Sequence, residues 1–315
     1  MAPDLEEITG TLSLVNLTIF SALSMPKLTS VGTINIEIAP ALESLGFTNG
    51  VTDCDSVLIT DTGLSSLDGI ELETCKMFNI NNNFGIRNIS IPSLYVVDGP
   101  VNIDFNAKTV YVEFPNLVTM QNGSFRQIGA ISMPSLNNVT GSLGFFESAL
   151  SQVILPNLTS TSESFSVVNN SQLTNCSTPN LKTIGGALFI ANNTEYDNIQ
   201  FNSVKTVGGA VDITGDFNNL SMTSLSQVKG GLNVQSSSQN FTCPFDNLRS
   251  SGAILGDSFV CTGRVVPQTG TNGTNITANT STDTEKKSGA SSNVITMGSF
   301  VFSGASVLAI AFSML

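Results

Sequence analysis

The chain has 315 residues, of which only 11% are charged, whereas soluble domains usually carry about 25% charged residues. Its formal net charge is −12, and it contains neither histidine nor tryptophan. The acidic balance argues against binding to nucleic acid, because phosphates attract basic proteins. Without histidine, Ser-His-Asp and Cys-His catalytic sites and imidazole metal ligands are excluded.

A short apolar pattern recurs from the first residues of the chain to about residue 240. Pro134, Pro156 and Pro179 stand at the same place in successive copies, 22 and 23 residues apart. Each copy contains an alternating segment, such as Leu188 and Ile190, and a second apolar set that precedes the next copy. Clear examples of the second set are Tyr196, Ile199 and Phe201, then Phe217, Leu220 and Met222.

Apolar residues at every second position are typical of a strand with one buried face. Glycine and asparagine, which suit turns, separate these segments. One copy cannot bury its own apolar face, so the copies must stack on one another. The sequence therefore predicts a mainly β fold, a right-handed parallel β-solenoid of about 10–11 rungs over residues 1–240, with helix nearly absent.

The pattern begins at once, since Pro3, Leu5 and Ile8 already match it. No charged segment followed by an apolar one precedes them, so the sequence shows no signal peptide before the first repeat. It also shows no capping unit there. The other end of the chain carries secretory features, described below. We therefore expect this sequence to be truncated at its N-terminus, the alternative being residence in the cytosol.

The repeat gives way to a different pattern after residue 240. We expect a C-terminal cap over residues 241–263, with a short helix that has Pro244 at its first position. Residues 264–287 consist mainly of Thr, Asn, Gly and Ser with almost no large apolar side chain. Such a segment cannot bury enough surface to fold, so it predicts a disordered, glycosylated stalk.

The last segment, residues 288–315, begins with small residues, continues with a polar spacer and ends in an apolar run from Phe300 to Leu315. This order is typical of a GPI-attachment signal. We expect attachment at Ser288, with Gly289 and Asn293 as alternatives. The competing interpretation is a tail-anchored membrane helix, which needs about 20 apolar residues and so exceeds this run.

Five cysteines allow two disulfides. Cys54 and Cys75 occupy the same place in consecutive rungs, and stacking predicts that their backbones lie within disulfide reach. Cys243 and Cys261 bracket the cap, where a second bridge is expected. Cys176 takes the place of an apolar residue and is predicted to be a buried free thiol. The alternative is that all five are reduced. No cysteine motif for zinc occurs, so neither a metal nor a cofactor is expected.

Asparagine pairs recur beside the predicted strands, and two explanations remain open for them. They can form a ladder that hydrogen-bonds the turns along the stack, which we favour, or they can carry glycans. The pairs are Asn82 with Asn83, Asn169 with Asn170, Asn192 with Asn193, and Asn218 with Asn219.

Thirteen Asn-x-Ser/Thr sequons are present, none with proline in the middle. Their number, on a chain with a lipid-attachment signal, indicates a secreted glycoprotein whose sugars hydrate a surface with few charges. A chain rich in Asn, Ser and Thr also produces sequons by chance, so some are expected to stay unused. The predicted acceptors are Asn16, Asn88, Asn122, Asn138, Asn157, Asn169, Asn175, Asn192, Asn219, Asn240, Asn272, Asn275 and Asn279.

Catalysis by paired carboxylates is the one enzymatic chemistry left open, since some β-helical proteins cleave polysaccharides with two acids. The candidates are Asp53 with Asp55, Asp104, Glu113 and Asp212. They fall on different rungs at no consistent position, so we expect solvated surface charges and no catalytic residues. Three tyrosines and no tryptophan also make a lectin site poorly supported.

Several motifs in order resemble the fungal GPI-anchored cell-wall organisation proteins, a group that includes extracellular-mutant and sporulation-specific wall proteins with receptor L-domain, leucine-rich-repeat-like repeats. The likeness spans residues 3–263 and the C-terminal signal. Its motifs are the Gly-Gly rungs at 185–193, 208–215 and 230–235, the segment 141–146, and the cap motifs 240–243 and 258–261.

The resemblance implies a non-enzymatic glycoprotein of the plasma membrane and cell wall, required for wall organisation and integrity. Its implied partners are wall polysaccharide (β-glucan) or wall mannoproteins, together with the outer leaflet through the lipid anchor, and no nucleic acid. Two alternatives remain. One is a receptor-like module that binds a ligand at the cell surface, and the other is a polysaccharide-active β-helix enzyme.

Overall fold

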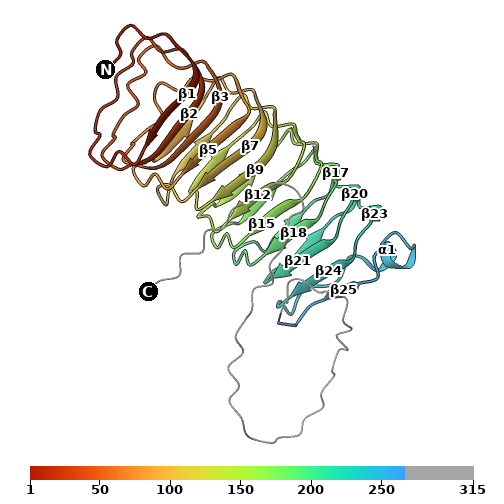
Figure 1. The fold of residues 1–315 in the computed structure, drawn as a ribbon. Helices are drawn as coiled ribbons and strands as arrows, with labels where there is room; N and C mark the ends of the chain where they lie inside the picture. The colour runs from red at the N-terminus through yellow and green to blue at the C-terminus, as the bar shows by residue number, and fades with distance from the viewer. Residues whose placement is uncertain (267–315) are drawn as a thin grey trace, which may run out of the picture. The chain divides into compact units, whose positions relative to one another are not determined.

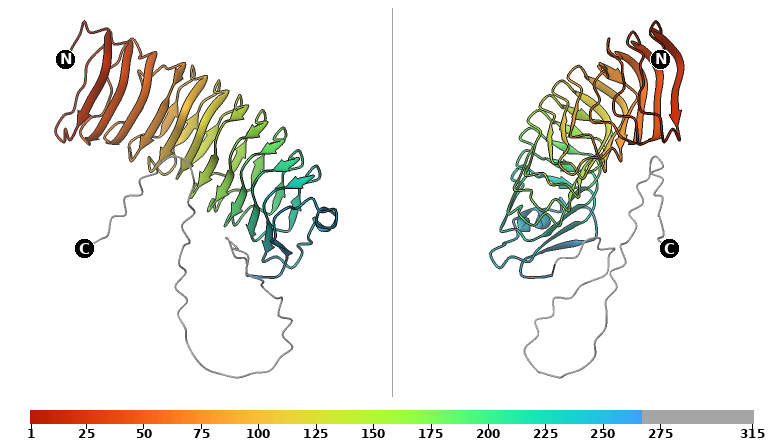
Figure 2. Two further views of the ribbon diagram at one scale, coloured as in Figure 1. Left: turned by 45° about the vertical axis from the view of Figure 1, so that its right-hand side comes forward. Right: turned by 90° about the vertical axis from the view of Figure 1, so that its left-hand side faces the viewer.

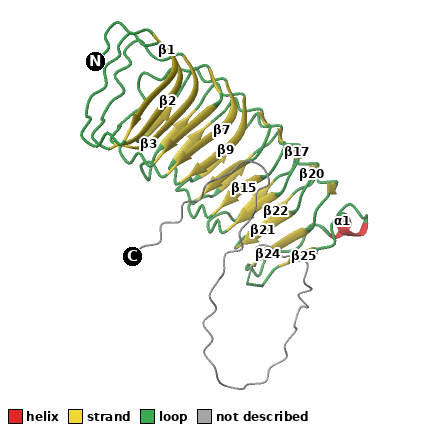
Figure 3. Cartoon of the chain, in the orientation of Figure 1, coloured by secondary structure: helices red, strands yellow, loops and turns green. Residues whose placement is uncertain are grey.

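The computed structural model describes residues 1–266 of the chain, and these form one stack of coils (Figure 1). Strands and loops make up nearly all of it, with one short helix near residue 250 (Figure 3). The coils follow each other along the stack in sequence order, as the colour gradient in both views of Figure 2 shows. The expectation of a mainly β solenoid is therefore confirmed.

Twelve strands form the main wall of the stack, and each pairs in parallel with the strand of the next coil. The first eleven belong to the repeats, close to the predicted 10–11 rungs, and the last comes from the cap. They are β1 (Glu7–Val15), β2 (Ser30–Ala39), β3 (Asp53–Thr62), β5 (Met77–Asn81), β7 (Val96–Asp104), β9 (Thr119–Arg126), β12 (Leu143–Phe146), β15 (Phe165–Val168), β18 (Leu188–Ala191), β21 (Val211–Gly215), β24 (Leu232–Ser236) and β25 (Phe259–Thr262).

Shorter strands complete each coil. Six extend the main wall: β4 (Thr74–Cys75), β11 (Asn138–Val139), β14 (Ser160–Thr161), β17 (Thr183–Ile184), β20 (Thr206–Val207) and β23 (Gln227–Val228). Seven return strands run along a separate edge: β6 (Asn88–Ser90), β8 (Tyr111–Glu113), β10 (Ala130–Ser132), β13 (Gln152–Ile154), β16 (Asn175–Ser177), β19 (Asn198–Gln200) and β22 (Asn219–Ser221). The return strands form three small sheets, because no pairing joins β10 to β13 or β16 to β19.

The pairing is in register, so equivalent residues of successive coils form columns. Leu188 lies between Phe165 and Val211, and all three are fully buried. Phe125, Phe145 and Phe165 stack along the wall with ring centroids 5.6 and 6.4 Å apart, and Phe201, which follows β19, packs on Phe165 with ring centroids 5.9 Å apart. The core is thus one continuous apolar column, which no single coil could bury alone.

A left-handed backbone residue turns the chain at the end of the main strand in each of nine coils. These residues are not glycines, and their φ angles lie between 49° and 58°. Asparagine and aspartate tolerate this conformation, whereas Ile38 and Phe105 adopt it at a steric cost. The nine are Asn16, Ile38, Asp61, Asn82, Phe105, Gln127, Glu147, Asn169 and Asn192, and we call this column the outer corner.

The C-terminal cap contains the predicted disulfide, with Cys243 and Cys261 joined at an S–S distance of 2.02 Å. Its helix α1 (Asp246–Ser250) begins later than predicted, because Phe245 is the N-cap residue and Pro244 precedes it. The cap also adds β25 to the main wall beside β24, a strand that the sequence did not predict. The interval between β24 and β25 differs from that of the repeat, so the repeat pattern does not predict β25.

The predicted Cys54–Cys75 bridge is wrong, because both thiols are free and buried in the structure. The two residues are equivalent, since each precedes the paired residues Ser56 and Met77 by two positions. Parallel neighbours lie about 4.8 Å apart with side chains pointing the same way, whereas disulfide Cβ atoms lie about 3.5–4.5 Å apart. The Cys54 thiol instead donates to the Ser56 carbonyl at 3.2 Å.

Candidate functional site

The asparagines beside the strands divide into an inner and an outer set. The inner set continues the stack as a ladder: Asn170 accepts from the Ser148 backbone N–H at 3.0 Å and donates to the Phe145 carbonyl at 3.0 Å. Asn193 accepts from the Asn170 N–H at 2.9 Å and donates to the Val167 carbonyl at 2.8 Å. Each buried amide therefore ties its own turn to the coil before it.

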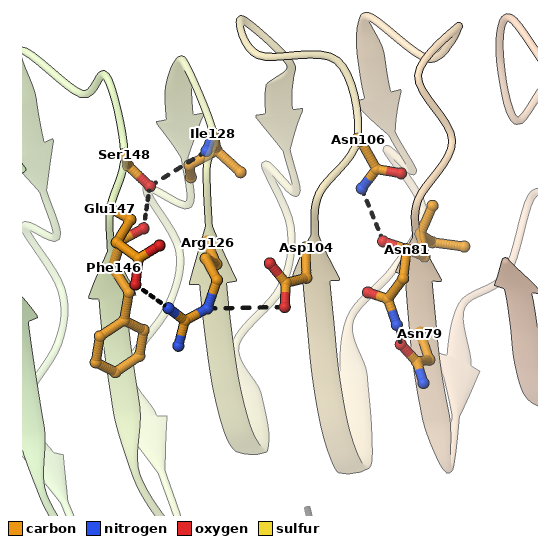
Figure 4. A network of polar contacts seen from close by, with 10 residues as sticks. Asn79, Asn81, Asp104, Asn106, Arg126, Ile128, Phe146, Glu147 and Ser148 are labelled. Carbon is orange, nitrogen blue, oxygen red and sulfur yellow. Dashed lines mark hydrogen bonds and ion pairs between the residues drawn. The ribbon is translucent and has the colours of Figure 1, made fainter. Parts of the chain in front are cut away.

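The same ladder recurs in earlier coils, where Asn106 accepts from the Asn83 N–H at 3.1 Å. Asn106 also donates to the Ile80 carbonyl at 2.7 Å, and Figure 4 shows Asn106 beside the strand that carries Asn79 and Asn81. Asn83 in turn accepts from the Thr62 hydroxyl. These amides are at most 5% exposed. The favoured explanation of the asparagine pairs is right for Asn83, Asn170 and Asn193.

The outer set contains the predicted glycan acceptors. Asn16, Asn169 and Asn192 stand at the outer corner, where the left-handed backbone directs them to solvent. Asn88, Asn175 and Asn219 begin return strands and are exposed as well. Asn157 and Asn240 are also exposed.

Two other predicted acceptors are only half-exposed, and both use their side-chain oxygen. Asn122 Oδ1 accepts from the Ser142 N–H at 2.8 Å, and Asn138 Oδ1 accepts from the Ser160 hydroxyl at 2.7 Å. The remaining predicted acceptors and attachment sites lie outside the described residues: Asn272, Asn275, Asn279, Ser288, Gly289 and Asn293.

A second surface lies on the outside of the main wall, where alternate residues point away from the core. We call its first six strands the outer strip and define it by two in-register columns. The first column is Ser13, Asn35, Leu58, Asn79, Asn102 and Ser124, and the second is Val15, Glu37, Thr60, Asn81, Asp104 and Arg126. All twelve residues are half-buried or exposed.

A small charged network closes the outer strip at its β9 end (Figure 4). Arg126 Nε lies 3.7 Å from Asp104 Oδ2, and its guanidinium also binds Glu147 and lies 5.1 Å from the centre of the Phe146 ring. Burial raises the pKa of Asp104 to about 6, although Arg126 opposes the shift.

Three buried oxygen atoms of the outer strip have no hydrogen-bond partner: Asn35 Oδ1, Asn81 Oδ1 and Asp104 Oδ1. All three are acceptors. Unpaired polar atoms cost free energy, about 1–3 kcal/mol each when buried, and most have partners in folded proteins. These atoms are enclosed by neighbouring side chains, so a ligand on the strip would contact the exposed parts of its Asn, Ser and Thr side chains.

The candidate catalytic carboxylates do not gather in a hollow. Asp55 pairs with Lys76 at 3.0 Å, Asp53 accepts from the Ser30 hydroxyl at 3.0 Å, and Glu113 accepts from Ser90 at 3.1 Å. Asp212 accepts from Asn233 at 2.7 Å. Two surface hollows of about 410 and 340 Å³ occur near the return strands, and neither is lined by Asp or Glu.

Within residues 1–266 no group of three or more acidic or cysteine side chains is placed to hold a metal ion. Over the same residues, no helix is both long and apolar enough to span a bilayer. Burial raises the pKa of the free Cys176 thiol to about 12, so this sulfur stays protonated inside the core.

Comparison with known proteins identifies the family of this chain. The chain is 44% identical over 256 residues to protein ecm33 of Aspergillus fumigatus and 43% identical over 263 residues to cell wall protein ecm33 of Schizosaccharomyces pombe. It is 36% identical over 275 residues to a cell surface GPI-anchored protein of Arthroderma benhamiae, of which it covers 70%. The chain belongs to this fungal Ecm33 family of GPI-anchored cell-wall proteins. The resemblance stated from the sequence is confirmed.

The Ecm33 matches take in 81% and 84% of this chain but only 64% and 62% of the two ecm33 proteins, so the chain spans less than two thirds of their length. No family model and no solved structure matches it. The relatives' names support the expected extracellular location at the cell surface and wall. No sequence signal indicated the outer strip, because its columns form only once the pairing register is known.

Proposed function

We propose that this Ecm33-family chain is a non-catalytic glycoprotein of the fungal cell surface that organises the cell wall. The observation that carries the proposal is the division of its asparagines. One set is buried and stiffens a long stack, while the sequon asparagines of the outer corner and return strands face solvent. A rigid rod with sugars along its sides suits a structural role, and its relatives are named as wall and surface proteins.

The anchor belongs to the same proposal. Lipid attachment at Ser288, or at Gly289 or Asn293, replaces the apolar tail and holds the rod outside the membrane. Residues 264–287 act as the stalk, and wall β-glucan or mannoproteins are the partners. Phosphatidylinositol-specific phospholipase should release the protein from membranes of cells that express the full chain. Retention on the membrane after treatment would contradict the lipid anchor.

The wall role is tested by deleting the gene and measuring growth on wall-stressing agents and the layering of wall mannoprotein. We expect sensitivity that the full chain restores and that a chain ending at residue 287 restores poorly, because it escapes into the medium. Normal growth and normal wall composition in the deletion strain would overturn the proposal. The truncated chain serves as the matched control, since its folded stack is unchanged.

A receptor-like function is the second candidate, and one patch favours it. Phe84 is 71% exposed and lines the smaller hollow together with Arg87 and Lys108. An exposed aromatic ring beside two cations is a feature of ligand-binding surfaces. In this case Phe84→Ala, which creates no sequon, should abolish rescue of the deletion strain while leaving thermal unfolding unchanged. Full rescue by the variant would favour the structural role.

A further inference from the structure

The predicted glycan acceptors avoid the outer strip from β1 to β7. The strip contains four asparagines, Asn35, Asn79, Asn81 and Asn102, and none of them begins a sequon. By contrast, sequons occupy three positions of the outer corner and three first positions of return strands. The β9 end of the strip differs, because Asn122 faces outward there and Ser124 is the third residue of its sequon. The strip from β1 to β7 is therefore an outward face on which no sequon begins.

Whether an asparagine of the strip begins a sequon depends on one residue, the one two positions after it. In a strand, residues two apart share a face, so a sequon there needs Ser or Thr in the second column. The asparagines of the first column are followed instead by Glu37, Asn81 and Asp104. Thr60 occupies the second column in β3, so threonine fits the position sterically. Packing therefore does not explain why threonine is missing beside the asparagines.

The chemistry of the strip suits a ligand that forms hydrogen bonds and carries no charge. Seven of its twelve residues are neutral and polar, namely four asparagines, two serines and one threonine, and all are half-buried or exposed. Only three of its twelve residues are ionisable, and two of these, Asp104 and Arg126, pair with each other. An anionic or cationic polymer would meet little complementary charge here, whereas the hydroxyl groups of a neutral polymer can donate to and accept from the amide and hydroxyl side chains.

The geometry also suits a linear polymer. In-register columns repeat about every 4.8 Å along the stack, so six strands extend over roughly 24 Å. We propose that the outer strip is a docking surface for a neutral wall polysaccharide that lies along the stack, across the strands, with its hydroxyls donating to the amide columns. The polysaccharide as occupant rests on the wall function proposed above.

The test uses one residue to place a glycan on the strip. The substitution Asn81→Thr completes a sequon that begins at Asn79, and it replaces a side chain whose own amide donates only to Asn79. The matched control is Gln200→Thr, which completes a sequon that begins at Asn198 on a return strand. Asn198 pairs there with the sequon residue Asn219. Both variants create the same Asn-Ile-Thr acceptor within a strand, and a mobility shift reports the added glycan.

The probe is insoluble β-1,3-glucan, sedimented with the full glycosylated protein. We expect the wild type and Gln200→Thr to bind alike and Asn81→Thr to bind at least about tenfold more weakly, a loss of about 1.4 kcal/mol. A second variant, Asn79→Val with Asn81→Val, removes the amides without adding a glycan and should also weaken binding. It is paired with Asn198→Val, which should not.

Equal glucan binding by the wild type, Asn81→Thr and the double valine variant would overturn the proposal. No binding by the wild type would overturn it too, yet the deletion strain would still test the wall role separately. Sedimentation velocity adds one outcome. If Asn81→Thr changes only the oligomeric state and not glucan retention, the strip joins two copies of this chain and the polysaccharide proposal is wrong.

Discussion

Adjacent asparagines do opposite things in this protein. Asn170 is fully buried and its amide joins three coils, while Asn169, one residue earlier, stands at the outer corner with φ 58° and faces solvent. The left-handed residue turns the chain at this corner, and the next side chain points inward. This conformation, more than residue type, decides which asparagine stabilises the stack and which is available to a glycan.

Replacing Asn170 with alanine should destabilise the stack by about 3–5 kcal/mol, because it leaves the Ser148 N–H and the Phe145 carbonyl buried without partners. The sequon at Asn169 stays intact in this variant. The control Asn169→Asp removes the sequon but keeps a residue that tolerates φ > 0, and should cost less than about 1 kcal/mol. Chemical denaturation of deglycosylated protein measures both, and equal losses would show that the ladder contributes little.

Asp104 should give the stack an unusual pH dependence. Burial raises its pKa in the folded state to about 6 from the usual 3.8, so the folded protein holds this proton more tightly than the unfolded chain does. Its contribution to stability is therefore complete below about pH 4 and is lost as the pH rises to about 6.

The variant Asp104→Asn should lack that decline. Between pH 4 and pH 7 its unfolding free energy should fall by about 1–2 kcal/mol less than that of the wild type, given a side chain 29% exposed to solvent. Asp53→Asn removes an exposed carboxylate on the same wall and serves as the control. Parallel pH profiles for wild type and Asp104→Asn would contradict the shifted pKa.

At the scale of elements, the repeating strands could be predicted because alternating apolar residues such as Leu188 and Ile190 must face a common core. What could not be predicted depends on distances across coils. Cys54 and Cys75 are neighbours as expected, yet in-register parallel backbones hold their side chains too far apart to bond. The sequence did not predict β25, because the cap does not keep the repeat spacing. Nor could it predict the larger surface hollow, which lies where the pairing between β10 and β13 is interrupted.

The cap disulfide should matter most at one end of the stack. Replacing Cys243 and Cys261 with alanine opens a loop with a sequence separation of 18 residues, which we expect to cost about 3 kcal/mol. Because each coil contacts mainly its neighbours, hydrogen exchange should accelerate in β25 and β24 and stay slow in β12. A uniform acceleration over all coils would mean that the stack unfolds as one unit.

The candidate site was predictable only in part. The sequons are visible in the sequence, and so is the scarcity of charge around them. The outer strip is not visible in the sequence. Asn35, Asn79 and Asn102 lie 44 and 23 positions apart, and only the pairing register places them in one column. Its unpaired acceptors and the Arg126 network likewise depend on side-chain packing that no local pattern encodes.

For the whole molecule, glycans should supply the solubility that charge does not. With 11% charged residues, the bare stack relies on the repulsion of its net charge of −12, which salt screens over about 8 Å at 0.15 M. Enzymatic removal of N-glycans should therefore leave the fold intact but cause salt-dependent aggregation, measured by light scattering against mock-treated protein. A deglycosylated protein that stays monodisperse at about three times that salt concentration would show that the sugars are dispensable for solubility.

The ladder of buried amides also limits how such a protein can change in length. Phe165 pairs with Leu188 across 23 residues, and Asn170 with Asn193 across the same interval. A deletion of that whole interval would rejoin matching partners and yield a stack one coil shorter. Loops already absorb differences of a few residues, because the paired positions Gly123 and Leu143 are 20 residues apart and Leu188 and Val211 are 23 apart. A deletion of one residue between Phe165 and Asn170, by contrast, would move the Asn170 amide away from its carbonyl partner. The length of such a stack should therefore change in whole coils, each adding about 4.8 Å, and not continuously.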